Sequence, residues 1–278
     1  MKKTYVAICL LLTVACTAIS KTKDVRVPNT DNEDLFIRVE GTDNAAYHKL
    51  AVMQHGLASN KEHQAIQAAK KAFLKNKYVV ITFDNRYSLG EGNNEVERVR
   101  LATFEDDLQT VIAWAQKQPF YHEPFALAGH SLGGATVLEF GAAHPEQVDI
   151  LVPITPLISG KKWETSCLKN MTAFCKSWKQ NGSFEYTDPS NQKTGHIPYA
   201  VVTSTQNYNA FSLAPKITAK TLLVAAQNDN IINAPDVQKL SAKMKNAQAV
   251  TIANSGHNFE EQQNQADLYR AIDTFLKQ

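Results

Sequence analysis

The sequence has little net charge, no long apolar run and no internal repeat. Its 278 residues include 29 Lys and Arg against 27 Asp and Glu, a formal net charge of +2. A chain this balanced gives no sign of the basic surface that binds nucleic acid. No segment approaches the roughly 20 consecutive apolar residues that form a membrane-spanning helix. We therefore expect no nucleic-acid partner, no membrane-spanning domain and no repeat architecture.

The N-terminus has the pattern of an export signal. Lys2 and Lys3 precede an apolar run over residues 5–15, and small residues follow that run. The run is too short to span a bilayer comfortably. We interpret residues 1–20 as a signal peptide, with a buried N-terminal helix as the alternative. The protein is then expected to be exported by a bacterium.

Two sites for signal cleavage stay open. Cleavage after Ser20 follows an acceptable pattern of small residues, whereas Thr13-Val14-Ala15-Cys16 resembles a lipobox that carries threonine in place of the usual leucine. In the second case Cys16 is acylated, and the lipid anchors the protein through the CH₂ groups that it buries. The mature protein is accordingly periplasmic, secreted or lipid-anchored at the cell envelope, and it meets a membrane only through Cys16.

Cysteine is scarce, with four residues in the whole chain. Cys9 and Cys16 fall in the predicted signal, which leaves Cys167 and Cys175 as an even pair in an exported protein. We expect these two to form a disulfide, and two buried free thiols are the alternative. No Cys/His cluster has the spacing of metal ligands, so neither a metal nor an organic cofactor is expected.

Apolar runs and amphipathic segments alternate along most of the chain, which is typical of one α/β domain over residues 21–278. The runs at 78–81 and 222–224 are wholly apolar, as in parallel strands that helices cover on both faces. The expected strands are 25–27, 35–40, 49–53, 78–83, 124–128, 149–154, 221–226 and 249–253, the first two forming an edge hairpin. The expected helices are 61–76, 103–117, 135–143 and 265–276.

The alternation stops after Thr155 and resumes near Ala219, 64 residues later. A structureless loop of that length is unusual in a compact domain, so we expect a cap over residues 157–212 with short helices around 164–179. Eight aromatic residues in the cap offer surface for an acyl chain or an aromatic ring, or form its own core: Trp163, Phe174, Trp178, Phe184, Tyr186, Tyr199, Tyr208 and Phe211. The seven lysines between Leu157 and Lys216 most simply form a solvated face.

The most informative motif is Gly129-His130-Ser131-Leu132-Gly133, which matches the nucleophile elbow G-x-S-x-G between an expected strand and an expected helix. On such a sharp turn the Ser131 hydroxyl projects above the sheet. The N–H of Leu132 then opens the helix and can donate to a developing oxyanion. A helix-capping serine is the alternative for the motif taken alone.

A serine needs a base, and the base needs a group that orients it. Asp229 and His257 each follow an expected strand, in the chain order Ser, Asp, His that this elbow requires. Asp236 is a weaker candidate because it follows a proline and is expected to cap the next helix. Asp149 lies before the cap, at the start of a strand. We therefore expect Ser131, His257 and Asp229 to form a catalytic triad.

The second oxyanion donor is expected in Gln54-His55-Gly56-Leu57, directly after the strand at 49–53. The backbone N–H of Leu57 would supply it, so the identity of that side chain matters little. Two such dipoles, from Leu57 and Leu132, each lower a barrier by about 3 kcal/mol. The alternative is that His55 and Gly56 form only a tight turn.

Together these motifs resemble the α/β-hydrolase superfamily from about Leu35 to the C-terminus. Within it the sequence is similar to bacterial serine esterases of the cinnamoyl or feruloyl esterase and monoacylglycerol lipase type. The resemblance implies a mostly parallel eight-stranded sheet with helices on both faces and a cap after the sixth strand. Asp84-Asn85-Arg86 with Gly90 and Gly92 also resembles the D-x-R-G-x-G loop of that family, although Tyr87 replaces a glycine and the spacing is stretched.

The expected function is hydrolysis of a small-molecule carboxylic ester through an acyl-enzyme, with Ser131 as nucleophile. Within enzymes, a thioesterase and a peptidase for small peptides are the alternatives. The alternative from another class is a binding protein that keeps the fold without turnover. A dehalogenase or epoxide hydrolase is disfavoured, because those reactions need a carboxylate at the elbow.

Overall fold

The computed structural model describes residues 22–29, 31–43, 47–92 and 95–278. The predicted signal peptide and the possible lipid site at Cys16 lie outside these residues. Within the described part of the chain, no helix is both long and apolar enough to cross a membrane.

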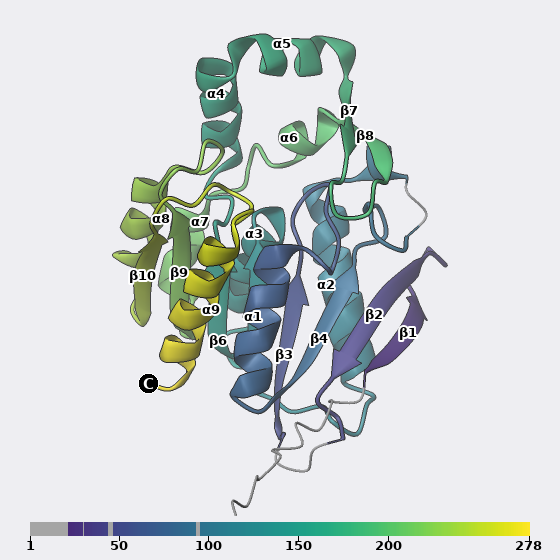
Figure 1. Ribbon diagram of the computed structural model, residues 1–278, viewed down its shortest axis with the longest axis vertical. Helices are drawn as coiled ribbons and strands as arrows, with labels where there is room; N and C mark the ends of the chain where they lie inside the picture. The colour runs from purple at the N-terminus through teal and green to yellow at the C-terminus, as the bar shows by residue number, and fades with distance from the viewer. Residues whose placement is uncertain (1–21, 30, 44–46, 93–94) are drawn as a thin grey trace, which may run out of the picture.

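The centre of the molecule is a mixed sheet of eight strands in the order β1-β2-β4-β3-β5-β6-β9-β10 (Figure 1). Strand β2 pairs antiparallel with both of its neighbours, and the other neighbours in the sheet are parallel. The mostly parallel eight-stranded sheet and the edge hairpin are therefore confirmed. The strands are β1 Lys23–Pro28, β2 Asp34–Glu40, β3 Lys49–Gln54, β4 Tyr78–Asp84, β5 Phe125–His130, β6 Val148–Ile154, β9 Lys220–Ala226 and β10 Ala247–Ile252.

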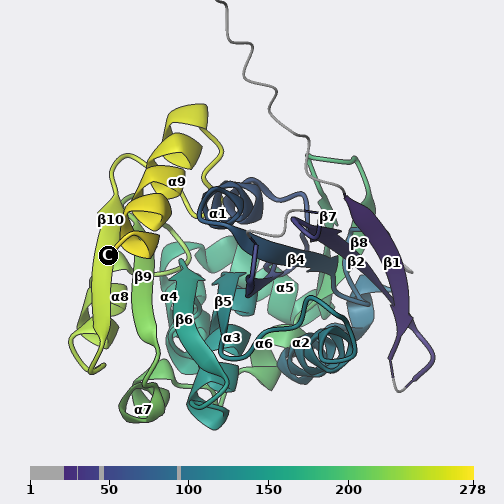
Figure 2. The same ribbon diagram turned by 90° about the horizontal axis from the view of Figure 1, so that it is seen from below.

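Helices cover both faces of the sheet, with α1 and α9 on one side and α2 and α3 on the other (Figure 2). Successive residues of a buried strand point to opposite faces, so Leu50 and Val52 of β3 pack with the α2 and α3 layer, and Ala51 and Met53 pack with α1 and α9. The helices of the body of the molecule are α1 Gln64–Lys75, α2 Leu101–Ala115, α3 Leu132–Ala143, α8 Ala234–Ser241 and α9 Gln262–Leu276, and the 3-10 helices are Val96–Arg98 and Ala214–Lys216.

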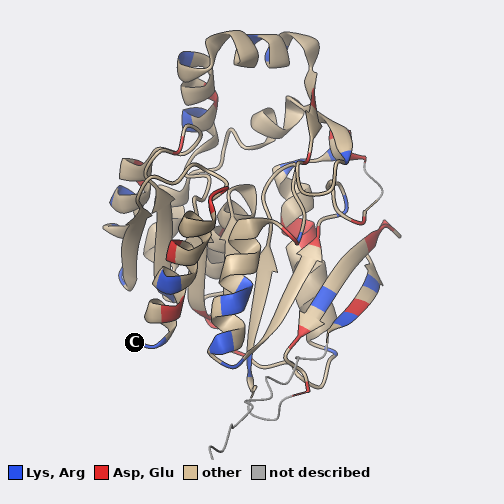
Figure 3. Cartoon of the chain, viewed as in Figure 1, with Lys and Arg blue, Asp and Glu red and all other residues tan. Residues whose placement is uncertain are grey.

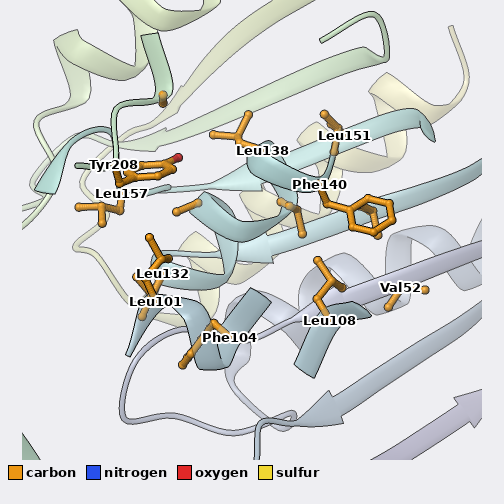
Figure 4. Packing of buried hydrophobic residues seen from close by; sticks show 14 of the residues in the cluster. Val52, Leu101, Phe104, Leu108, Leu132, Leu138, Phe140, Leu151, Leu157 and Tyr208 are labelled. Atoms are coloured by element: carbon orange, nitrogen blue, oxygen red, sulfur yellow. The ribbon is translucent and has the colours of Figure 1, made fainter. Parts of the chain in front are cut away.

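The layer between the sheet and α2 with α3 forms the larger core. Figure 4 shows Leu108 of α2 and Phe140 of α3 beside Val52 of β3, and all three are at most 8% exposed. Near the elbow the same layer contains Leu132 and Leu157, at 3% and 4% exposure. Burying side chains of this size contributes about 1.5–3 kcal/mol each, so the turn that holds Ser131 is built on a tightly packed base.

Residues 157–212 form a layer of short elements at the top of Figure 1, above the sheet. The layer comprises α4 Gly160–Asn170, α5 Thr172–Asn181, the hairpin β7 Ser183–Thr187 with β8 Thr194–Pro198 and α6 Ala200–Ser204. The last residues of the range begin α7 Ala210–Leu213, which packs against α3 in the body of the molecule. The hairpin was not expected from the sequence. A disulfide joins Cys167 in α4 to Cys175 in α5, with Cα atoms 5.8 Å apart, which confirms the predicted bond.

The role predicted for Asp236 is wrong in its detail. The residue before α8 is Asn233, and Asp236 lies inside the first turn of that helix. Its carboxylate accepts a hydrogen bond from Lys162 of the cap, with N and O 2.9 Å apart. Pro235 occupies one of the first two helical positions, where its missing N–H costs nothing. Asp236 therefore connects the cap to the body of the molecule and does not cap the helix.

Two carboxyl groups, Glu139 on α3 and Glu105 on α2, meet at the interface between these helices. Burial, together with the hydrogen bond to Glu105, raises the pKa of Glu139 to about 9. The folded state thus holds a proton that the unfolded chain releases near pH 4.5. The contribution of this proton to the free energy of unfolding is fully present below pH 4.5 and is lost as the pH rises toward 9.

Replacing Glu139 by glutamine is expected to remove this pH dependence, since an amide stays neutral and still hydrogen-bonds. The variant should unfold at a higher urea concentration than the parent at pH 8.5 and at a similar one at pH 5. Urea midpoints at both pH values measure the difference. Glu146→Gln, an exposed glutamate after α3, is the control. Equal shifts of the Glu139→Gln midpoint at both pH values would contradict the assignment.

Candidate active site

Ser131 lies on a strained turn between β5 and α3, with φ 54° and ψ −112°. A positive φ costs a non-glycine residue about 1–3 kcal/mol, and packing of the turn offsets this cost. A Cβ on Gly129 would lie 2.2 Å from the Gly133 carbonyl oxygen, and one on Gly133 would lie 2.4 Å from that of His55. Both motif glycines are thus required by close backbone approach.

The three side chains predicted to form a triad come together in the structure. Nδ1 of His257 lies 2.7 Å from a carboxylate oxygen of Asp229. On the other side of the ring, Nε2 lies 2.9 Å from the hydroxyl oxygen of Ser131. The side chains of Asp229 and His257 are 1% and 7% exposed. A continuous, nearly dry line of hydrogen bonds therefore runs from the carboxylate to the serine hydroxyl.

The loop after β9 fixes the Asp229 carboxylate. One oxygen accepts the N–H groups of Ile231 and Ile232, each at 2.8 Å, which leaves the other oxygen for His257. Because a carboxylate only accepts, Nδ1 of His257 carries the proton in this pair and Nε2 is free to accept one. The N–H of Asn228 also bonds the Ser255 carbonyl at 2.8 Å, which joins the acid loop to the base loop.

The predicted oxyanion donors lie beside Ser131. Leu132 is the first residue of α3, so its N–H has no acceptor within the helix. Gly56 packs so closely on the elbow that a Cβ built on it would lie 3.1 Å from the Cβ of Ser131. Leu57 and Leu132 both line the cavity that contains Ser131 and His257.

His55 orients the peptide that carries the Leu57 N–H. The backbone N–H of Asn85 donates to Nε2 of His55 at 3.1 Å, so Nδ1 carries the proton and donates to the Gly56 carbonyl at 2.7 Å. Burial lowers the pKa of His55, which keeps the ring neutral. The peptide between Gly56 and Leu57 is planar and trans, so its C=O and N–H point in opposite directions. Holding the Gly56 oxygen on His55 therefore fixes the direction of the Leu57 N–H, which points away from His55.

The segment after β4 supports this turn. Asp84, 1% exposed, accepts the backbone N–H and the ammonium group of Lys61 and the N–H of Glu91. Arg86 pairs with the buried carboxylate of Asp107 at 2.6 Å. These contacts agree with a structural role for the segment, because they hold Asn85 against His55.

A cavity of about 630 Å³ lies between the elbow and the cap. Five of the eight aromatic residues singled out in the cap line it: Trp163, Phe174, Trp178, Phe184 and Tyr186. The indole N–H of Trp178 donates to the Ile197 carbonyl at 2.9 Å, so the polar edge of that ring is satisfied and its faces stay apolar. Tyr199, Tyr208 and Phe211 are not part of this wall and pack into the cap and core.

Charge in the cavity is one-sided. Among the described residues, its wall includes the carboxylates Asp188 and Glu260 and no lysine or arginine. The cap lysines lie on α4, α5 and the segments after them, as the blue positions of these helices in Figure 3 illustrate. The lysine excess of the cap therefore gives no reason to expect an anionic substrate.

Sequence reasoning missed two histidines that the fold places at the site. The ring of His130 stacks on that of His63, with centroids 4.5 Å apart, and it also faces His257 at 4.9 Å. Burial lowers the pKa of His63 to about 3, so this ring is neutral too. The position of His130 next to Ser131 was a usable signal, whereas nothing in the sequence near His63 marked it.

The strand order, the covering helices and the serine turn after β5 identify an α/β hydrolase. Within this class the chain belongs to the family described as serine aminopeptidase, S33, whose model matches residues 45–262. An Escherichia coli protein described as an uncharacterized 31.7 kDa protein in the traX-finO intergenic region is 25% identical over 221 residues, 69% of this chain and 76% of that protein. The uncharacterized hydrolase YraK of Bacillus subtilis is 33% identical over 86 residues, 31% of this chain and 30% of YraK.

Solved structures share the fold at low identity. Est1E from Butyrivibrio proteoclasticus, solved with ferulic acid bound, has a TM-score of 0.70 at 18% identity and covers 91% of this chain and 98% of its own. The esterase Pf2001 from Pyrococcus furiosus has a TM-score of 0.68 at 18% identity, covering 93% and 90%. These likenesses establish the fold of the chain, and its substrate has to be argued from the site.

Proposed function

We propose that this protein is a serine hydrolase that cleaves carboxylic esters through an acyl-enzyme. The observation that carries the proposal is the line of hydrogen bonds from Asp229 through His257 to Ser131, which opens into a cavity of about 630 Å³. A serine hydroxyl needs such a base and such an orienting acid to attack a carbonyl at neutral pH. Membership of an α/β-hydrolase family supports the same chemistry.

The proposed reaction proceeds in two halves. Oγ of Ser131 attacks the ester carbon while Nε2 of His257 takes its proton, and the N–H groups of Leu57 and Leu132 stabilise the oxyanion. The carbon–oxygen bond of the ester then breaks, and His257 returns the proton to the leaving alcohol. Water attacks the acyl-enzyme by the same route, which releases the acid and restores Ser131. No metal or organic cofactor takes part.

The cavity wall favours an apolar acyl group or an aromatic ring. Aromatic and aliphatic side chains from the cap form one side of it, among them Trp163, Met171 and Phe184. Such a wall gains free energy by removing apolar substrate surface from water. A carboxylate on the substrate would instead meet Asp188 or Glu260 with no cation beside it. The proposed substrate is thus an uncharged small-molecule ester.

Labelling and turnover by the purified protein test the function. A fluorophosphonate probe is expected to attach to Ser131, identified by peptide mapping, and p-nitrophenyl esters should turn over faster than matched acyl-thioesters. A series from acetyl to palmitoyl, with a feruloyl ester, identifies the acyl group. Faster turnover of thioesters would replace the esterase by a thioesterase, and absence of labelling would favour a binding protein.

A second candidate is an aminopeptidase for small peptides. The description of the matching family supports it, and so do the carboxylates of Asp188 and Glu260 at the cavity wall, which suit an ammonium group. Aminoacyl-anilides with free and with acetylated amino groups distinguish the two functions. Turnover of the free anilides above that of the esters, lost on acetylation, would favour the peptidase.

Export and lipidation remain part of the proposal, because the residues concerned lie outside the described part of the chain. The intact mass of the full-length gene product, purified from whole cells and medium of a bacterial host, tests both. A mass that starts after Ser20 indicates ordinary cleavage, and a diacylated Cys16 indicates an anchored lipoprotein. The full-length mass would contradict export.

His55 variants test how the oxyanion turn is held. Replacing His55 by alanine is expected to lower kcat by about 10- to 100-fold, because the Gly56 peptide loses the donor that orients it. Asparagine carries an N–H where Nδ1 stands and should retain more activity than glutamine, whose donor lies further out. Steady-state kinetics on one p-nitrophenyl ester measure both. Equal losses in the two variants would contradict the orientation argument.

A further inference from the structure

His130 stands immediately before Ser131, at the end of β5, and its side chain is 2% exposed. The proposed reaction leaves this residue without a role. Its ring lies between the ring of His63, nearly parallel at 19°, and the ring of His257, tilted by 47°. A buried polar side chain next to the nucleophile calls for an account of its hydrogen bonds.

The hydrogen bond of His130 is directed at the base loop. Nε2 lies 3.0 Å from the backbone carbonyl oxygen of His257. A carbonyl only accepts, so Nε2 carries the proton and donates it. The other nitrogen, Nδ1, faces the oxyanion turn, where a Cβ built on Gly56 would approach it to 2.9 Å. One imidazole therefore touches both the base loop and the oxyanion turn.

A second side chain donates to the same carbonyl. The hydroxyl of Thr155, fully buried just after β6, lies 3.4 Å from the His257 oxygen. This bond is longer than an ordinary O–H···O bond and is expected to be the weaker of the two. The loop that carries the base is thus held at its own backbone by the ends of two adjacent central strands.

We propose that His130 is a positioning residue, which holds the His257 backbone so that the base meets the Ser131 hydroxyl. The inference rests on the proposed function. The base loop contains no regular secondary structure over residues 253–261, and Phe259 in it has φ 58°. Fixing the carbonyl fixes the point from which the imidazole projects. Displacement of a reacting group by about 1 Å can cost about 100-fold in rate.

Three substitutions separate this role from simple packing. His130→Ala removes the donor and the ring. His130→Gln removes the ring but carries an N–H three bonds beyond Cβ, as Nε2 of histidine does. Thr155→Val removes the weaker donor and keeps the β-branched shape. His144→Ala is the control, since the His144 ring lies against that of Phe140 at the far end of α3 and does not line the cavity.

The readouts are kcat and KM for a p-nitrophenyl ester and the rate of fluorophosphonate labelling. We expect His130→Ala to lower kcat and the labelling rate by about 10- to 100-fold with KM within about twofold. His130→Gln should recover most of the loss, Thr155→Val should lose only a few-fold, and His144→Ala should match the parent.

Each outcome bears on a different claim. Wild-type rates in His130→Ala would overturn the positioning role. Equal losses in the alanine and glutamine variants would also overturn it, because the effect would then come from losing the ring and not from losing the donor. If the alanine variant does not fold, the comparison of glutamine with the wild type decides, and a 10-fold or larger loss in His130→Gln overturns the role. Absence of labelling in the wild type would refute the hydrolase itself.

Discussion

Ser131→Ala is expected to lower kcat by about 10⁶-fold, the loss seen when a triad nucleophile is removed. Alanine retains the Cβ that packs against the Gly56 turn, and it meets the same backbone strain at φ 54° that serine meets. The variant should therefore fold and bind substrate like the parent. A residual rate above that of water is expected, because the oxyanion donors Leu57 and Leu132 stay in place.

Three measurements check this expectation: turnover of a p-nitrophenyl ester, labelling by a fluorophosphonate and thermal unfolding. Ser177→Ala is a matched control, because Ser177 lies exposed on α5 and does not line the cavity. It should label and turn over like the parent. A Ser131→Ala variant that still labels, or that loses less than about 100-fold in kcat, would show that another residue is the nucleophile.

The positions of the three central side chains could be predicted because each follows a strand of a parallel sheet. The carboxyl ends of parallel strands lie at one edge, so residues after β5, β9 and β10 share that edge and their loops can bring the side chains together. The apolar runs of β5 and β9 are clear in the sequence, and β10 is recognised by the shorter run that precedes His257. Distance along the chain, 126 residues between Ser131 and His257, therefore did not hide their proximity.

Other features depend on contacts that no local pattern encodes. Asp236 follows a proline and has the local features of a cap residue, yet Lys162 from the cap reaches its carboxylate. His130 was visible within the elbow motif, but its bond to the His257 carbonyl requires the register of β5 against the base loop. The hairpin β7–β8 was missed because its strands are short and half exposed, which weakens the alternating pattern.

Asp229→Asn is expected to lower kcat by about 10⁴-fold with little change in folding. In the parent, one carboxylate oxygen accepts two backbone N–H groups and the other accepts Nδ1–H of His257. Asparagine has only one oxygen, and the two N–H groups retain it. The amide nitrogen is then forced to face His257 and donates to Nδ1. The ring proton therefore sits on Nε2 and points at Ser131. Nε2 then has no free lone pair and cannot accept the serine proton.

The loss expected in Asp229→Asn depends on which way its amide group faces. A matched substitution at Asp236 shows whether the loss is specific to the carboxylate that contacts His257. Asp236→Asn changes the same atoms in the acid that sequence alone offered as a rival, and it should weaken only the contacts with Lys162 and Lys239. Its kcat is expected to stay within about twofold of the parent, because these partly exposed ion pairs contribute little and lie outside the cavity that contains Ser131. Steady-state kinetics of the two asparagine variants compare the sites directly. Because the same atoms change at both positions and only Asp229 contacts His257, equal activities would mean that Asp229 does not orient the base.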